Sequence, residues 1–274
     1  MSGGARKASR GAERAARSSF TKRLGRLGFV AKGLLYAVVA LIALEVARGE
    51  RRKAQGEEGA IATLADESFG EVLLVLLAVG LAGYALWRLR IAVLGPPGES
   101  GAKAQAERLG SVALAIAYAS LCLYVIRFLT GSSGGSSTEP DSVTKSLLDE
   151  PYGVALVIAI GIVLLGVAAY EAHKAVTRSF LDDLELGRMS PRERQVAIVT
   201  GAAGHAALTV ISALVAVFMI KAAVEHDPKE AIGLDGALQE LVTQDLGPFL
   251  LGTVAVGLLI YAGYCVIEAR YRKL

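Results

Sequence analysis

The chain has little of what metal centres and redox sites are built from. Its 274 residues include two cysteines and three histidines. His173, His205 and His226 lie on separate segments without the spacing of metal ligands. Cys122 and Cys265 lie inside apolar segments, where cysteine usually behaves as a small hydrophobic side chain, and nothing in the sequence supports a disulfide between them. We therefore expect neither a metal nor another cofactor.

Catalytic motifs are also scarce. A Gly-x-Ser-x-Gly pattern surrounds Ser133, but a nucleophile elbow needs a strand before it and a helix after it. This stretch is rich in glycine and serine and is typical of a flexible linker. The spacing of Gly201 and Gly204 resembles part of a phosphate loop, yet no strand is predicted before them. Because no carboxylate pair or nucleophile accompanies these patterns, we expect no enzymatic activity.

What the chain has in abundance is long apolar runs. Apolar residues make up 53% of it and the mean hydropathy is +0.48, whereas soluble domains contain about 45–50%. Six segments approach the ~20 apolar residues that a membrane-spanning helix needs. They are residues 28–47, 69–88, 110–130, 152–170, 196–220 and 247–267. Six buried helices of a soluble protein would need polar helices to cover them, which the chain lacks. The predicted fold class is therefore all-α, an integral membrane protein with six transmembrane helices.

The charges predict how the chain crosses the membrane. Most of the 29 Lys and Arg residues lie in the N-terminal arm, in residues 88–108 and 174–194, and after Glu268, while the other three loops are acidic. Because positive loops stay in the cytoplasm, we expect a multi-pass protein of the bacterial cytoplasmic (inner) membrane with both termini cytoplasmic.

The basic arm, residues 1–23, allows two interpretations. It is either a disordered cytoplasmic tail or an interfacial helix in which Phe20, Leu24 and Leu27 face the membrane. In the second case its partners are membrane lipids with anionic headgroups. An unknown membrane protein partner is a further candidate. Nucleic acid is not expected, since no aromatic or groove-reading pattern accompanies the charge.

The sequence repeats itself. GLAGYALWRLRIA, starting at Gly80, matches GLLIYAGYCVIEA, starting at Gly257, without gaps, and a weaker copy follows Gly153. The first spans repeat too, because Gly28, Gly110 and Gly204 share one repeat position. We therefore predict three tandem parallel hairpins in a pseudo-threefold arrangement about the membrane normal. We name them repeat 1 (24–97), repeat 2 (98–178) and repeat 3 (196–274), with a cytoplasmic linker at 179–195.

The repeated residues suggest structural roles. Small residues mark helix contacts in lipid, and the candidates are Gly28, Gly33, Ala37, Gly80, Gly83, Gly110, Gly166, Gly204 and Gly257. Trp87, Tyr170 and Tyr264 share one position, where we expect aromatic side chains at the cytoplasmic headgroups. Each outer loop is expected to contain a short amphipathic helix, and the next span should begin at glycine. The pairs of leucine or isoleucine residues that indicate these helices are Ile61 and Leu64, Leu147 and Leu148, and Leu238 and Leu241.

Ionisable residues inside spans are the better lead to function, because they are costly there. Glu45, Arg127 and Lys221 occupy one repeat position, so we hypothesise an intramembrane ion-pair cluster; the alternative is that each side chain reaches the outer headgroups by itself. Lys32 is expected to reach the cytoplasmic surface in the same way. Glu171 is expected to face water. His205 is expected to be a packed neutral histidine, and the alternative is a proton-linked role.

Several motifs resemble one known family. RLGFVAKG at residues 26–33, GALQEL at 236–241, FLDDL at 180–184 and EARYR at 268–272 are similar to the bacterial domain-of-unknown-function family 1206. The resemblance covers residues 24–272 and implies three tandem two-helix membrane repeats without an agreed activity. The family pattern Ala-Arg-Gly appears here as Ala31-Lys32-Gly33 in repeat 1 alone.

Two functions are consistent with these observations. The first is a non-enzymatic membrane protein that acts by membrane packing, lipid contact or partner binding. The alternative is a channel or small-solute transporter with a path between the three hairpins. Such a path needs a continuous polar stripe, and Ser120, Thr209 and Ser212 provide only a sparse one.

Overall fold

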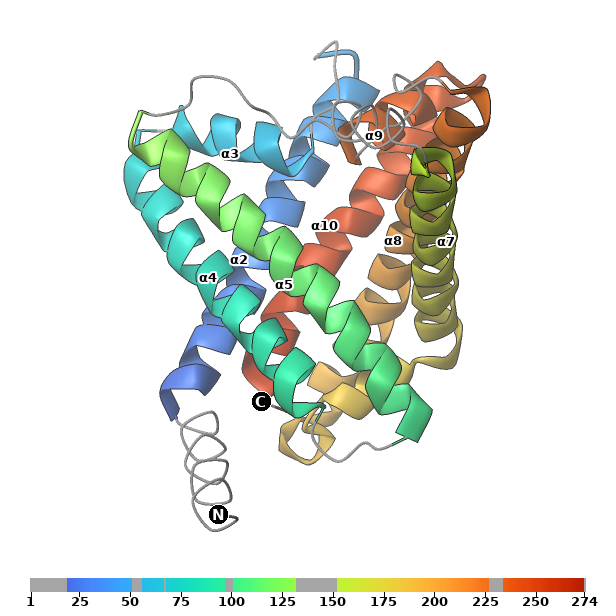
Figure 1. Cartoon of the computed structure of the whole chain (residues 1–274). Coiled ribbons are helices and arrows are strands. Elements are labelled where there is room, and N and C mark those ends of the chain that lie inside the picture. Colours follow the sequence, from blue (N-terminus) through green and yellow to red (C-terminus); the bar gives the residue numbers. More distant parts are fainter. Residues whose placement is uncertain are drawn as a thin grey trace.

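The computed structural model describes residues 19–50, 56–66, 68–96, 101–131, 152–226 and 234–273. Apart from one isolated bridge between Leu184 and Arg272, the secondary structure of these residues is helical (Figure 1). Six helices are long and apolar enough to cross a membrane. They are α2 (Ser19–Ala47), α4 (Gly70–Leu94), α5 (Gly101–Leu129), α7 (Gly153–Thr177), α8 (Pro191–Glu225) and α10 (Gly247–Tyr271). The prediction of an all-α chain with six long apolar helices is confirmed.

The helices extend beyond the predicted apolar segments, mostly at the ends rich in Lys and Arg. α4 continues to Leu94 and α7 to Thr177, while α2 already begins at Ser19 within the predicted arm. Charged residues end an apolar run, but Lys and Arg are good helix formers and do not end the helix. α8 begins earlier than predicted because Ser190 and Glu193 form a capping box, so the linker ends at Ser190.

Two short helices lie at one end of the bundle, α3 (Glu57–Ala65) and α9 (Leu234–Thr243) (Figure 1). We call this the outer end, and the opposite end, where α2 begins and α10 stops, the inner end. The two helices bury residues at matching repeat positions against the spans. These are Ala60, Ile61 and Leu64 in α3 and Ala237, Leu238 and Leu241 in α9. The predicted outer-loop helices are therefore present in repeats 1 and 3, while the segment around Leu147 lies outside the described residues.

Glycine begins the span that follows each outer loop. α4, α7 and α10 start at Gly70, Gly153 and Gly247. A side chain at Gly70 would overlap the carbonyl oxygen of Ala65, and one at Gly247 would overlap that of Val242. The close approach of the outer helix to the span therefore requires glycine at these positions.

The six spans pack in an open series, α5–α4–α2–α10–α8–α7. In Figure 1, α5 slopes across the front of the bundle and α7 stands at its side. Along the described residues these two helices make no extended packing contact. The two spans of repeat 2 are thus apart, whereas α2 packs on α4 in repeat 1 and α8 on α10 in repeat 3.

Repeats 1 and 3 close their hairpins by the same contacts. A side chain at Gly80 would overlap the Cβ of Ala31, and a Cβ at the matching Gly257 would lie 2.6 Å from that of Ala207. Likewise, a Cβ at Gly28 would lie 2.6 Å from the Cβ of Tyr84.

The third repeat reproduces this second contact, because a Cβ at Gly204 would lie 2.7 Å from the Cβ of Tyr261. Gly33 approaches α10 at Ala262 and Cys265. These glycines lie at close helix crossings, as small residues do in membrane proteins.

Repeat 2 lacks these contacts. Its residues at the positions of Gly80 and Tyr84 are Val163 and Val167, and both are exposed. The branched side chain of Val163 does not allow the approach that glycine allows. Gly110 and Gly166, which were predicted to mark packing, are exposed, and a Cβ added to either would meet no described atom within 4 Å outside its own helix. That prediction is corrected for these two residues.

Candidate functional site

Polar and aromatic side chains gather in the inner half of the bundle, around Lys32. Its Nζ donates a hydrogen bond to the hydroxyl of Tyr261 (2.7 Å). It also lies over three rings, at 4.9 Å from the centroid of Tyr261 and 5.8 Å from those of Tyr36 and Tyr84. Lys32 was expected to reach the cytoplasmic surface. Instead it points into the bundle, where the ring faces attract its charge.

The helix periodicity confirms that Lys32 faces inward. Val30 and Leu41 are 48% and 52% exposed and mark the outward face of α2. With 3.6 residues per turn, Lys32 lies on the opposite face. It is seven residues from Gly25, where the apolar span begins, so its backbone lies about 10 Å from the inner end of that span.

A fourth tyrosine joins this group from α5. The ring of Tyr118 lies 4.5 Å from that of Tyr84, centroid to centroid. The Tyr84 hydroxyl accepts hydrogen bonds from Nε and Nη2 of Arg88 (3.1 and 2.8 Å). Lys32, Tyr36, Tyr84, Tyr118 and Tyr261, which we call the lysine–tyrosine site, thus come from four different spans.

A second polar group lies between α7 and α8. His205 is buried, and its Nδ1 makes a short contact with a carboxylate oxygen of Glu171. Lys174 pairs with the same carboxylate at 3.7 Å. Glu171 was expected to face water, but the packing of α7 on α8 places it against His205. The Nε2 atom of His205 is buried without a hydrogen-bond partner among the described residues.

The predicted interface aromatics lie in different surroundings. Trp87 and Tyr264 are 4% and 0% exposed, whereas Tyr170 is 53% exposed. Trp87 packs edge-on against Phe29, and Tyr264 packs edge-on against Phe180. The rings of Trp87 and Tyr264 therefore face the protein interior, because the close hairpins of repeats 1 and 3 enclose them.

The linker and the C-terminus are joined at the inner end by backbone hydrogen bonds. The linker contains the two short 3-10 helices η1 (Ser179–Asp183) and η2 (Leu186–Arg188). The N–H of Glu185 donates to the carbonyl oxygen of Tyr271 (2.7 Å), and that of Lys273 donates to the carbonyl oxygen of Asp183 (2.9 Å). A bridge between Leu184 and Arg272 brings the FLDDL and EARYR motifs into direct contact.

Arg272 completes this junction. It pairs with Asp183 (3.0 Å) and, more closely, with Glu268. Its guanidinium also lies 5.1 Å from the ring centroids of Phe29 and Trp87 in repeat 1. Burial lowers the pKa of Arg272, but the carboxylates of Glu268 and Asp183 outweigh it and hold the pKa above its ordinary value.

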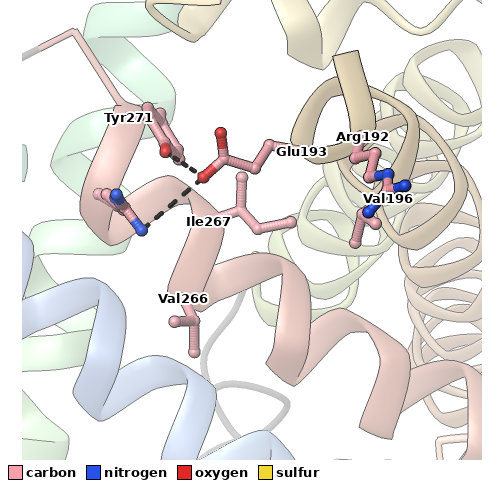
Figure 2. A pocket seen from close by; sticks show the side chains of 7 residues that line it. Arg192, Glu193, Val196, Val266, Ile267 and Tyr271 are labelled. Atoms are coloured by element: carbon pink, nitrogen blue, oxygen red, sulfur yellow. Dashed lines mark hydrogen bonds and ion pairs between the residues drawn. The ribbon is translucent and has the colours of Figure 1, made fainter. Parts of the chain in front are cut away.

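A shallow groove lies outside this junction, between the start of α8 and the end of α10 (Figure 2). Glu193 lies at its centre, where it accepts a hydrogen bond from the hydroxyl of Tyr271 (2.5 Å) and pairs with Arg270 at 3.8 Å. The rest of the lining comes from Val196, Val266 and neighbouring residues. These bonds join the inner ends of two spans of repeat 3.

The hypothesised outer cluster of Glu45, Arg127 and Lys221 stays a prediction. Lys221 pairs with Glu225 on its own helix at 3.9 Å. Glu45 and Lys221 each make other interactions.

The arrangement offers groups that can bind a ligand. The described residues contain no group of three His, Cys, Asp or Glu that could hold a metal ion. Cys122 and Cys265 are both free and buried. The lysine–tyrosine site supplies hydrogen-bond donors and aromatic faces. The sequence contained one signal for this site, the shared repeat position of Tyr36 and Tyr118. The direction in which the Lys32 side chain points depends on which helices pack next to α2, and the sequence does not give this.

Comparison with known proteins gives the same three repeats. The model of the family described as Domain of Unknown Function (DUF1206) matches residues 27–95, 109–178 and 203–272. The chain is also similar to an uncharacterized protein, YxxB, of Bacillus subtilis (strain 168), with 30% identity over 254 residues that cover 92% of each chain. No solved structure matches the chain.

Proposed function

The chain belongs to the DUF1206 family of three tandem membrane repeats, and from this premise we propose that it is a non-enzymatic protein of the bacterial inner membrane that binds a membrane amphiphile between the two spans of repeat 2. In this proposal both termini lie in the cytoplasm. The contact of the basic arm with anionic headgroups stays a prediction, because residues 1–18 lie outside the described residues.

The proposed arrangement of the repeats is pseudo-threefold. It is supported by the packing of α2 on α10, α5 on α4 and α8 on α7. In each case the first span of one repeat lies on the second span of the preceding repeat, with repeat 3 preceding repeat 1. In a complete ring α5 would also lie on α7, so the missing contact opens the ring at repeat 2.

The observation that carries the proposal is a partly exposed layer on the inward face of α2. Val39 and Ala43 above it are fully buried, and Phe29 below it is 1% exposed. Lys32 and Tyr36, which lie between these residues along the helix, are partly exposed. They face inward, and α5, which brings Tyr118 to the same group, does not pack extensively on α7, so we infer that a ligand reaches these side chains from the lipid between α5 and α7.

A channel, the alternative function, has less support. The outer half of the bundle is filled by apolar residues of the spans and of α3 and α9, in one continuous cluster. The polar groups around Lys32 and His205 lie in the inner half. A path for ions would need to cross the apolar half, where desolvation of a charge is costly.

The experiment compares the native protein with a variant, Val163→Gly/Val167→Tyr, that gives repeat 2 the residues of repeats 1 and 3. Spin labels at Ile116 and Ile162, which are exposed on α5 and α7, report the helix separation. Native mass spectrometry reports the lipid that stays bound. We expect the variant to shorten the label distance and to lose the bound lipid.

The matched control is Val75→Gly/Val79→Tyr, the same exchange at two exposed positions of α4. It should retain the lipid. Loss of lipid from both variants, or equal retention by both, would contradict the proposal. Ion flux into proteoliposomes, measured alongside, would favour the channel if it is well above that of empty liposomes.

A further inference from the structure

We propose that Lys32, Tyr36 and Tyr118 bind the anionic head group of an amphiphile, a carboxylate or a phosphate, whose acyl chain lies between α5 and α7. This inference rests on the proposed function and names the chemistry of its ligand. It is argued from the unused donors, from the charges and from the apolar sides of the opening.

The lysine–tyrosine site has more hydrogen-bond donors than partners. An ammonium group has three N–H donors, and one hydrogen bond is described for Lys32, to Tyr261. Within the described part of the chain the hydroxyls of Tyr36 and Tyr118 form no hydrogen bond, and both residues are partly exposed. Tyrosine hydroxyls beside an apolar core favour a hydrogen-bond partner, so these groups can donate to the acceptor atoms of a ligand.

The charges of the inner half also favour an anion. Glu171 is engaged by His205 and Lys174, and Glu268 is engaged by Arg272. No salt bridge to a carboxylate is described for Lys32 within the described part of the chain. Charged groups at this depth in a membrane are nearly always paired. A carboxylate or phosphate would supply both the missing charge and several acceptor oxygens.

The opening beside the site suits an acyl chain. On the α7 side, Val163 and Val167 are 65% and 41% exposed. On the α5 side, Gly110 and Ala113 hold the repeat positions that face the partner span in repeats 1 and 3, and both are exposed. Tyr118 belongs to the same helix, so a chain between α5 and α7 can end with its head group at Tyr118 and Lys32.

The test measures binding to the full chain in nanodiscs of phosphatidylcholine. The probes are palmitate, phosphatidic acid, inorganic phosphate and, as a neutral amphiphile, 1-hexadecanol. We expect Lys32→Met to weaken palmitate and phosphatidic acid binding by about tenfold or more, which corresponds to one charged hydrogen bond. Hexadecanol binding should not change. Lys32→Arg keeps the charge and should bind both anions nearly as the native protein does.

Tyr36→Phe and Tyr118→Phe each remove only a hydroxyl group and provide a second measurement if Lys32→Met does not fold. We expect each to weaken anion binding by about threefold to tenfold. If the Lys32 and tyrosine variants bind the anions as well as the native protein, the assignment of the head group is overturned, while the opening is still tested by Val163→Gly/Val167→Tyr.

The remaining outcomes separate the sources of the anion. If inorganic phosphate competes as well as phosphatidic acid, the anion site stands and the acyl chain is overturned. If the native protein binds none of the amphiphiles, hexadecanol included, the proposed function fails together with this inference.

Discussion

In repeats 1 and 3 a glycine of the second span, Gly80 or Gly257, lies against an alanine of the first span, whereas repeat 2 has Val163 at that position. The alanine itself is unchanged, since Ala113 occupies the position in repeat 2. In lipid, helices associate mainly by close packing. One branched side chain at the crossing therefore accounts for a hairpin that does not close, although the repeats share a common pattern.

The same comparison shows how one repeat position takes on different chemistry. Phe29 packs edge-on against Tyr84 and Trp87 in repeat 1. The matching His205 packs edge-on against Tyr261 and Tyr264 in repeat 3 and adds the contact with Glu171 from repeat 2.

In repeat 2 the corresponding residue is Ser111, which is buried on α5 without a hydrogen-bond partner for its hydroxyl among the described residues. The three repeats thus share one pattern of helices, and the residue types at a shared position, Phe29, His205 or Ser111, decide whether the surroundings are apolar or polar.

The largest expected effect is at the glycine crossings. Gly28→Val would place its side chain on backbone atoms of Tyr84, which cannot move aside as a flexible side chain would. We expect destabilisation by at least about 3 kcal/mol, at the upper end for overpacking. The matched variant is Gly110→Val at the same repeat position. It should change stability by less than about 0.5 kcal/mol. Thermal unfolding of the two variants in one detergent measures the difference, and equal losses would show that α5 and α7 do pack.

A smaller effect is expected at the aromatic position of the repeats. Trp87→Ala removes ring contacts with Phe29 and Tyr84. In water-soluble cores such a change costs about 3–5 kcal/mol, but lipid is as apolar as the helix interior, so only packing is lost. We therefore expect about 2 kcal/mol here, and less than about 0.5 kcal/mol for Tyr170→Ala at the exposed position of repeat 2. Chemical denaturation in mixed micelles compares the two, and a Tyr170 effect as large as that of Trp87 would contradict the open hairpin.

The sequence was sufficient for the features that can be read along one segment at a time. The length and apolarity of each run predict the six spans, and their internal similarity predicts three repeats. The short outer helices and the glycines that begin the next spans also follow from local pattern, as Ile61, Leu64 and Gly70 show in repeat 1.

The features that sequence reasoning missed depend on which helices adjoin. Lys32 has the spacing of a residue that can reach the surface, and only the neighbouring α4 and α10 show that Tyr84 and Tyr261 surround it. Tryptophan is common at membrane interfaces, so the sequence suggested an interface position for Trp87. In the folded chain the ring of Phe29 packs against it. The contact between the two motifs at Asp183 and Arg272 spans 89 residues, and no periodic pattern predicts a pairing of that kind.

The smallest effect is expected at the last repeat position, which holds Arg272 in repeat 3 and Arg178 in repeat 2. Arg272→Gln removes the charged bonds to Asp183 and Glu268 at the inner end of repeat 3. Charge-assisted hydrogen bonds are worth about 1.5–3 kcal/mol, and the amide of the glutamine still offers an N–H donor to Glu268, so we expect a loss of about 1.5 kcal/mol.

The matching Arg178 of repeat 2 is exposed and ends α7, and Arg178→Gln should change stability by less than about 0.5 kcal/mol. Hydrogen exchange of the linker measures both variants directly, because the N–H of Glu185 donates to Tyr271 beside Arg272. Faster exchange at Glu185 in Arg272→Gln alone would show that the junction of linker and C-terminus depends on the charge of repeat 3. Equal exchange in both variants would mean that the backbone bonds hold the linker without it.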